Sequence, residues 1–123
     1  MARLTGDLRE RTLRFGMDVL SVVAKFPRET VGWTVGKQLA RSATSIGANA
    51  WEANAAVSEA DFANKISIAH KEANETQYWL ELARRANLID SGAFDRLHKE
   101  VDELTRILST IVRKTREHIA DER

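Results

Sequence analysis

Two long apolar series in the second half of this chain constrain its fold more than any other feature. Each series alternates steps of three and four residues, which places its side chains on one face of an α-helix. A repeat sustained in this way averages 3.5 residues and is typical of helices that pack left-handedly at about 20°. The first series is Phe62, Ile66, Ala69, Ala73, Thr76, Leu80 and Ala83, and the second is Phe94, Leu97, Val101, Leu104, Leu108, Ile111 and Thr115.

The first half of the chain predicts two further helices on either side of Pro27. A helix over about residues 4–26 is predicted by the apolar stripe of Leu8, Phe15, Val19, Val22 and Phe26. A helix over about residues 29–54 is predicted by Val31, Val35, Leu39, Ile46, Ala50 and Ala53. The residue before a proline avoids the helical region, so the first helix should end there. Glycines within the second helix suggest close packing of a neighbouring helix.

Capping signals complete the predicted helix boundaries. Ser58 with Asp61 resembles a helix start, which predicts a third helix over about residues 58–87 that Asn87 can close. Asp90 or Ser91 can cap a fourth helix over about residues 91–119. Short connections make consecutive helices antiparallel. The sequence therefore predicts one all-α domain over residues 1–123, an antiparallel up-down-up-down four-helix bundle.

Composition excludes several classes of protein. The chain has no cysteine, which excludes disulfides, thiolate metal sites and cysteine nucleophiles. Its apolar runs are far shorter than the roughly 18 residues of a membrane span. The beginning of the chain also lacks the apolar region of a signal peptide. We therefore expect a cytoplasmic protein that does not associate with membranes.

Polar residues interrupt the apolar faces of the second and third predicted helices. The second helix has a polar row of Gln38, Ser42, Ser45, Asn49 and Glu52, and the third has a second row of Ile68, Glu72, Glu75, Trp79 and Leu82. Buried polar groups require hydrogen-bond partners. We therefore predict a structural polar network that includes Ser45, Asn49, Glu52, Glu72 and Glu75, with arginine partners.

Three interpretations of these carboxylates compete. Helical-bundle metal sites combine glutamates with Glu-x-x-His motifs, but this chain has only Glu72-x-x-Glu75 and Asp95-x-x-His98. General acid–base catalysis also uses paired carboxylates, but no nucleophile motif or phosphate loop accompanies them. A network that fixes helix register or subunit pairing is favoured. We assign no catalytic residue, metal ligand or cofactor, and we interpret the three histidines as surface or structural side chains.

Positive charge is concentrated near the beginning of the chain. Residues 1–41 hold eight basic and four acidic residues, whereas residues 42–76 hold two basic and five acidic residues. A basic surface binds nucleic-acid backbones with little sequence preference, and salt weakens that binding steeply. The alternative for each cation is an ordinary solvated helix face. The candidate nucleic-acid-binding residues are Arg3, Arg9, Arg11, Arg14, Lys37 and Arg41.

Two segments resemble a known family. The segment Arg41-Ser-Ala-Thr-Ser-Ile-Gly-Ala-Asn-Ala-Trp-Glu52 is similar to the Ser-Ile-x-x-Asn-x-x-Glu signature of the four helix bundle protein family, also called the large-subunit rRNA intervening-sequence protein family. Asp61-Phe62 and the segment from Lys71 to Leu80 resemble its second signature. The resemblance covers roughly residues 8–115. It implies an up-and-down bundle that assembles as a homopentamer, without an established enzymatic activity.

These observations lead to two functional hypotheses and a weaker third. The first is a non-enzymatic protein that associates with RNA or DNA through a basic face of a homopentameric ring. The resemblance supports it, because a related bundle in this family accompanies a reverse transcriptase and binds nucleic acid. The alternative is a protein–protein adaptor or assembly scaffold that uses the broad apolar arc of the third helix. The third hypothesis is an enzyme or metal protein centred on Glu52, Glu72 and Glu75.

Overall fold

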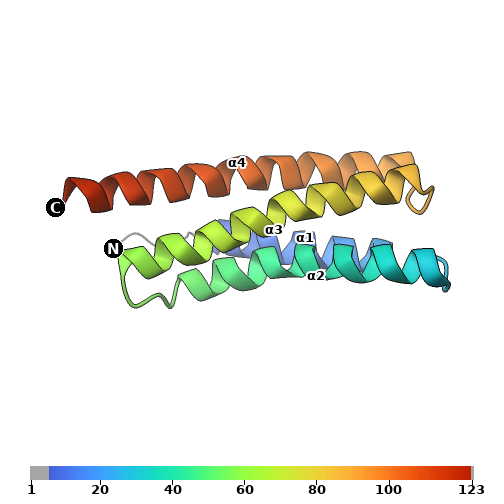
Figure 1. Ribbon diagram of the computed structural model, residues 1–123, viewed down its shortest axis with the longest axis horizontal. Coiled ribbons are helices and arrows are strands. Elements are labelled where there is room, and N and C mark those ends of the chain that lie inside the picture. Colours follow the sequence, from blue (N-terminus) through green and yellow to red (C-terminus); the bar gives the residue numbers. More distant parts are fainter. Residues whose placement is uncertain (1–5, 123) are drawn as a thin grey trace.

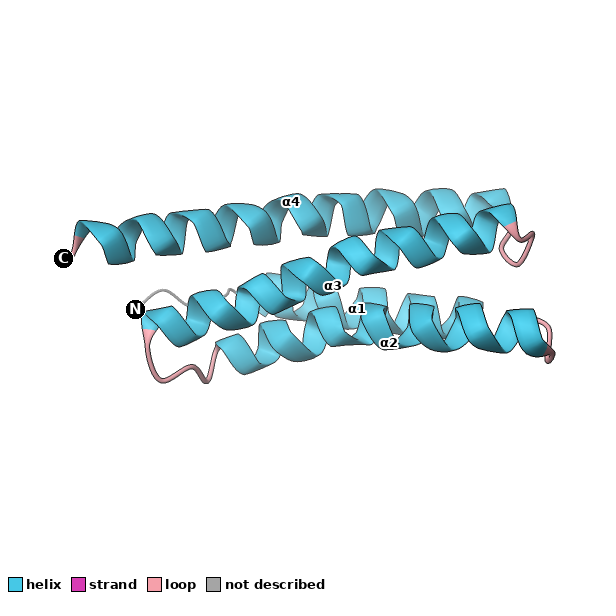
Figure 2. Ribbon diagram, in the orientation of Figure 1, coloured by secondary structure: helices cyan, strands magenta, loops and turns pink. Residues whose placement is uncertain are grey.

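The computed structural model describes residues 6–122, and four antiparallel α-helices account for most of them (Figure 1). They are α1 (Gly6–Val23), α2 (Thr30–Ala53), α3 (Glu59–Arg85) and α4 (Ser91–Asp121). Short loops join consecutive helices, and the described residues contain no strand (Figure 2). The predicted all-α four-helix bundle is confirmed. The last turns of α4 extend beyond the start of α3 (Figure 1).

The predicted helix ends are close to those observed, with one difference in α1. That helix ends at Val23 rather than at Phe26. The amides of Lys25 and Phe26 donate to carbonyls three residues earlier, which tightens the chain ahead of Pro27. Phe26 is nevertheless buried, so its predicted place in the core is confirmed although it lies outside the helix.

Side-chain caps define the starts of the last two helices. Ser58 Oγ accepts a hydrogen bond from the amide of Asp61 at 3.0 Å, and Asp90 Oδ1 accepts one from the amide of Ala93 at 2.8 Å. Asn87 follows the end of α3 with a φ angle of 59°, a left-handed conformation that asparagine tolerates better than most residues. The predicted roles of Ser58, Asp90 and Asn87 are therefore confirmed.

A single apolar core runs between the four helices. Every member of the first apolar series is buried, and in the second series only Phe94 and Ile111 are partly exposed. Helix α3 packs against both α2 and α4, whereas α1 and α4 have the sparsest contact. Val31 was predicted to belong to the core stripe of α2, but its side chain is 47% exposed in the first turn.

Glycines allow α1 and α2 to pack closely. A Cβ at Gly47 would lie 3.4 Å from the backbone carbonyl oxygen of Thr12, and one at Gly36 would lie 3.1 Å from a methyl carbon of Val23. At Gly32 a Cβ would clash with the backbone carbonyl of Pro27, so the α1–α2 connection requires glycine there. The expectation that these glycines mark close helix packing is confirmed.

Candidate functional site

A charged cluster on α2 and α3 contains two of the predicted network residues. Arg41 donates to Glu72 Oε2 from Nη1 at 3.1 Å and also forms an ion pair with Glu75. Trp79 Nε1 donates to Glu75 Oε2 at 2.9 Å, and Gln38 Oε1 accepts from Arg41 Nε at 3.0 Å. We call Arg41, Glu72, Glu75 and Trp79 the Arg41 cluster. It connects α2 to α3 at the edge of the apolar core.

A buried pair of hydroxyl groups lies beside this cluster. Thr76 Oγ1 is 2.9 Å from Ser42 Oγ and 2.8 Å from the carbonyl oxygen of Glu72. The hydroxyl of Ser42 also lies 3.3 Å from the carbonyl oxygen of Leu39. Both side chains are fully buried, and each has a hydrogen-bond partner. The hydroxyl pair and the Arg41 cluster thus provide hydrogen-bond partners for the polar side chains that meet between α2 and α3.

The remaining predicted network residues form separate contacts. Asn49 Nδ2 donates to the carbonyl oxygen of Ser45 within the same helix at 2.8 Å. Glu52 is exposed near the end of α2 and forms an ion pair of 3.2 Å with Lys65 of α3. Within residues 6–122, no hydrogen bond or ion pair joins these three residues to the Arg41 cluster. The predicted single network is therefore divided into separate local contacts. The side-chain amide of Asn49 donates within α2, to the carbonyl oxygen of Ser45, and not to a carboxylate of α3.

The carboxylates of the Arg41 cluster are already engaged as hydrogen-bond acceptors. Glu72 and Glu75 bind the guanidinium of Arg41, and Glu75 also accepts from an indole N–H. His98, which was interpreted as a surface or structural side chain, stacks on Phe94 with ring centroids 5.3 Å apart. This geometry favours the structural interpretation, in which the acids fix the register of α2 against α3.

Most of the candidate nucleic-acid-binding arginines are engaged within the chain. Arg11 forms ion pairs with Glu100 at 2.8 Å and Glu103 at 3.0 Å on α4, and the hydrogen bond to Glu100 is the main cause that raises the pKa of its guanidinium. The guanidinium of Arg9 lies 4.0 Å from the ring centre of Trp51. These contacts hold α1 against its neighbours, so both arginines have structural roles.

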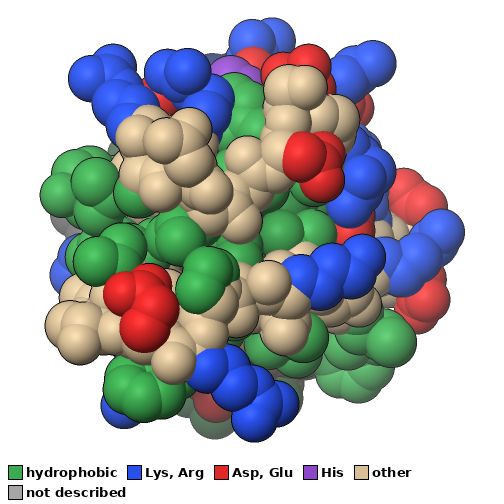
Figure 3. Space-filling model, turned by 90° about the vertical axis from the view of Figure 1, so that its right-hand side faces the viewer, with side chains coloured by type: hydrophobic (Ala, Val, Ile, Leu, Met, Phe, Trp, Pro, Cys, Tyr) green, Lys and Arg blue, Asp and Glu red, His purple; other side chains and the backbone are tan. Residues whose placement is uncertain are grey.

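The other basic candidates differ in their surroundings. Arg14 forms an exposed ion pair of 3.5 Å with Glu10 in its own helix, and Arg41 belongs to the cluster described above. Lys37 is exposed, and among residues 6–122 it has no ion-pair partner. Arg3 lies outside the described residues. Figure 3 views the end of the bundle that carries the α1–α2 and α3–α4 loops, where basic and acidic side chains are interspersed.

An apolar hollow lies on the surface between α1 and α2. It has a volume of about 410 Å³, and no charged residue lines it. We call it the α1–α2 groove; it is lined by Thr12, Leu13, Gly16, Met17, Leu20, Thr44, Gly47, Ala48 and Trp51. Leu13, Met17 and Leu20 are 44%, 62% and 47% exposed. A contiguous exposed apolar patch of this kind typically marks an interaction surface.

The α1–α2 groove was not predicted from the sequence. The sequence pattern assigns the apolar surplus to the second row of α3, but Trp79 and Leu82 of that row pack against the core. The available signal was a second apolar row on α1, with steps of four and three residues from Leu13 to Met17 and Leu20. This row is shorter than the core stripe of the same helix, and the core stripe predicts the apolar face of α1.

Comparison with known proteins identifies the family. The family model of the 23S rRNA-intervening sequence protein matches residues 7–110. The chain belongs to this family. A crystal structure of a protein of unknown function from the S23 ribosomal protein family of Bacteroides thetaiotaomicron is 38% identical, with a TM-score of 0.80. That match covers 86% of this chain and 95% of the other chain.

Two further findings describe this member of the intervening-sequence family. No curated protein matches the chain significantly. None of the helices described here is long and apolar enough to cross a membrane. The predicted family resemblance is confirmed, and both signature segments lie where α2 and α3 face each other. The family is one of unknown function, so the activity of this chain must be inferred from its own surface.

Proposed function

We propose that this protein acts without catalysis as a homo-oligomer whose subunits associate through the α1–α2 groove. The observation that carries the proposal is the exposed row of Leu13, Met17 and Leu20 beside that groove. Burying apolar surface stabilises association by about 25 cal/mol per Å² before the costs of association are subtracted. The uncharged lining suits an apolar side chain of a second copy. We further propose that the oligomer is a pentamer, the state that the family resemblance implies.

Measurement of molar mass in solution tests this assembly. We expect the wild-type protein to be oligomeric by light scattering coupled to size-exclusion chromatography. Met17→Glu places a charge in the groove and should reduce the molar mass while the helical circular dichroism is retained. Ser109→Glu is the matched control, because it adds the same charge to an exposed position on α4. A wild-type monomer at all accessible concentrations would contradict the proposal.

We further propose that the assembled protein associates with RNA or DNA through cations that the fold leaves uncompensated. Lys25, Arg28 and Lys37 are exposed and have no ion-pair partner among residues 6–122. An oligomer multiplies each of these charges by the number of subunits, which strengthens attraction to a phosphate backbone. The description of the family, which refers to 23S rRNA intervening sequences, gives a reason to test RNA first.

Retention of nucleic acid at two salt concentrations tests this second step. Structured RNA and duplex DNA should be retained at low salt and released at high salt. Combined Lys25→Glu, Arg28→Glu and Lys37→Glu should abolish retention without changing molar mass. Reversal of Arg11 is unsuitable, because it would break ion pairs to α4. Absence of retention at low salt would remove the nucleic-acid hypothesis and leave the assembly hypothesis standing.

A protein–protein adaptor is the second candidate, and the α1–α2 groove is again the relevant surface. An amphipathic helix of another protein can place apolar side chains in such a groove. The mass measurement separates the two cases. A monomeric wild-type protein favours an adaptor, whereas an oligomer that Met17→Glu dissociates shows that a second copy occupies the groove.

A further inference from the structure

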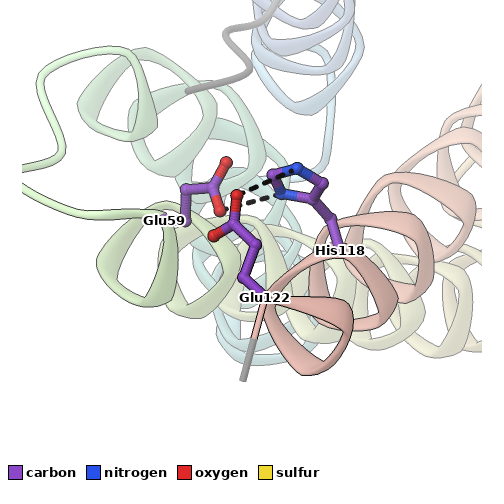
Figure 4. Close-up of side chains that lie close together, drawn as sticks. All are labelled: Glu59, His118 and Glu122. Carbon is purple, nitrogen blue, oxygen red and sulfur yellow. Dashed lines mark hydrogen bonds and ion pairs between the residues drawn. The ribbon is translucent and has the colours of Figure 1, made fainter.

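Three side chains that can bind metal ions meet where α3 begins and α4 ends. His118 Nδ1 lies 3.0 Å from Glu59 Oε2, and His118 Nε2 lies 3.3 Å from Glu122 Oε1 (Figure 4). One ligand atom from each residue lies within 4.8 Å of the other two. Within the part of the chain that the structure describes, this is the group of acidic and histidine side chains close enough to share one ion.

The helices themselves bring these residues together. His118 lies in the last turn of α4 and Glu122 directly follows the helix with helical backbone angles, so these two residues, four apart, lie on the same side. Glu59 is the first residue of α3, directly after the capping Ser58. Antiparallel packing of α3 and α4 places the start of one beside the end of the other. The cluster therefore joins two helices through residues 59 positions apart in the sequence.

We propose that Glu59, His118 and Glu122 form a binding site for a divalent transition-metal ion of the zinc class. Imidazole and carboxylate together are ligands that Zn²⁺ accepts readily, at about 2.0–2.2 Å, whereas Mg²⁺ prefers oxygen ligands alone. A tetrahedral ion with such bonds separates its ligand atoms by about 3.3–3.6 Å. One ligand atom from each of the three residues already lies within 4.8 Å of the other two, so a small contraction would suffice. One nitrogen of His118 would bind the ion, and small side-chain rotations would bring both carboxylates to it.

The surroundings of the cluster leave room for the rest of a coordination shell. The three side chains border an open hollow of about 550 Å³, together with Val57, Ser58, Ala60 and Ile119. Three protein ligands and an open position for water are the usual arrangement at an accessible zinc ion.

Protonation of His118 competes with the metal ion. The hydrogen bond that His118 donates to Glu59 raises the pKa of His118, and the charges of Glu122 and Asp121 add to this effect. Glu59 faces the imidazole from α3, and Glu122 and Asp121 face it from α4. A bound ion requires the neutral imidazole, so affinity should increase as the pH rises. The ion would fasten the projecting end of α4 to α3.

Titration of the full-length protein with zinc chloride tests the site. After treatment with a chelator and buffer exchange, isothermal titration calorimetry at pH 7.5 should show one site per chain. His118→Ala and Glu59→Gln should each weaken binding about tenfold or more. His98→Gln is the matched control, because His98 is also exposed on α4 but stacks on Phe94. Circular dichroism confirms that the variants remain helical.

Two further measurements distinguish this site from an ordinary ion pair. Zinc should raise the thermal midpoint of the wild-type protein and of His98→Gln, but not that of His118→Ala. Magnesium chloride should produce no comparable effect. The proposal is overturned if the wild-type protein does not bind zinc, or if His118→Ala binds it as tightly as the wild type does. Neither outcome bears on the assembly proposed above, because the α1–α2 groove involves other residues.

Discussion

The contact between α2 and α3 and the contact between α1 and α4 are built in opposite ways. Helices α2 and α3 share the most extensive contact in the bundle and enclose the buried Ser42–Thr76 pair. Helices α1 and α4 touch sparsely and are joined by Arg11 with Glu100 and by Arg96 with Asp18 at 2.9 Å. The first contact depends on burial, whereas the second depends on solvent-accessible ion pairs.

The two contacts are expected to contribute unequally to the stability of the bundle. Side chains removed from water contribute a stabilisation that salt does not screen, and any polar group among them must keep its partner. Exposed ion pairs contribute little, because water and salt screen them. We therefore expect the α2–α3 contact to determine stability and the α1–α4 contact to adjust it.

The largest expected effect comes from the core between the helices. Ile46 of α2 is fully buried, so Ile46→Ala should lower the free energy of unfolding by about 2–5 kcal/mol. Val31→Ala is the matched control, because Val31 is on the same helix but is 47% exposed; it should cost about 0.5 kcal/mol or less. Urea denaturation followed by circular dichroism measures both. Equal losses would show that burial does not govern this helix.

A smaller effect is expected at the Arg41 cluster. Glu72→Ala removes one acceptor from Arg41 but leaves Glu75, so the loss should be about 1–2 kcal/mol. The same variant should be compared with wild type for molar mass, because the cluster also bears the family signature. Glu81→Ala is the control, since the ion pairs of Glu81 within residues 6–122 are with Arg84 and Arg85 of its own helix. Unchanged stability and mass would refute the structural role of Glu72.

A still smaller effect is expected between α1 and α4. Arg11→Ala should lower the free energy of unfolding by about 1 kcal/mol or less, and the loss should shrink as salt is added. Arg106→Ala removes an ion pair within α4 and serves as the control. A loss at Arg11 that matches the loss at Ile46 and persists in high salt would overturn the contrast between the two contacts.

The smallest effect is expected at the ion pair between His118 and Glu59 in the absence of metal, and it depends on pH. Because Glu59 raises the pKa of His118 in the folded state, the folded protein binds the proton more tightly than the unfolded chain does. The stabilisation is therefore full below about pH 6.5, the ordinary histidine value, and is lost as the pH rises through the raised pKa. In chelator, the difference between the thermal midpoints of wild type and His118→Gln should be largest below about pH 6.5 and should shrink as the pH rises above that value. A constant difference would contradict this coupling.

Periodicity explains why the fold was predictable while the surface contacts were not. The series from Phe62 to Ala83 is buried throughout, because alternating steps of three and four residues fix a helix face without reference to distant residues. Arg41 shows the limit of such reasoning. Its charge suggested nucleic acid, but its partners Glu72 and Glu75 lie on another helix and no spacing rule connects them.

The Glu59, His118 and Glu122 cluster has the same origin. The four-residue spacing of His118 and Glu122 is visible in the sequence, yet Glu59 joins them only through the antiparallel pairing of α3 and α4. The α1–α2 groove likewise required the glycine-mediated approach of two helices. In each case the contributing residues are individually ordinary for a helix surface.

Four helices, the caps that begin the last two of them, the buried series on α3 and α4, and membership of the intervening-sequence family could all be predicted from the order of the residues. These properties depend on local conformational preference and on one-dimensional spacing. Only the tertiary structure decided which arginines are paired, where the apolar groove opens and which acids meet His118. Those properties depend on the relative rotation and offset of neighbouring helices, which place side chains together across long separations in the chain.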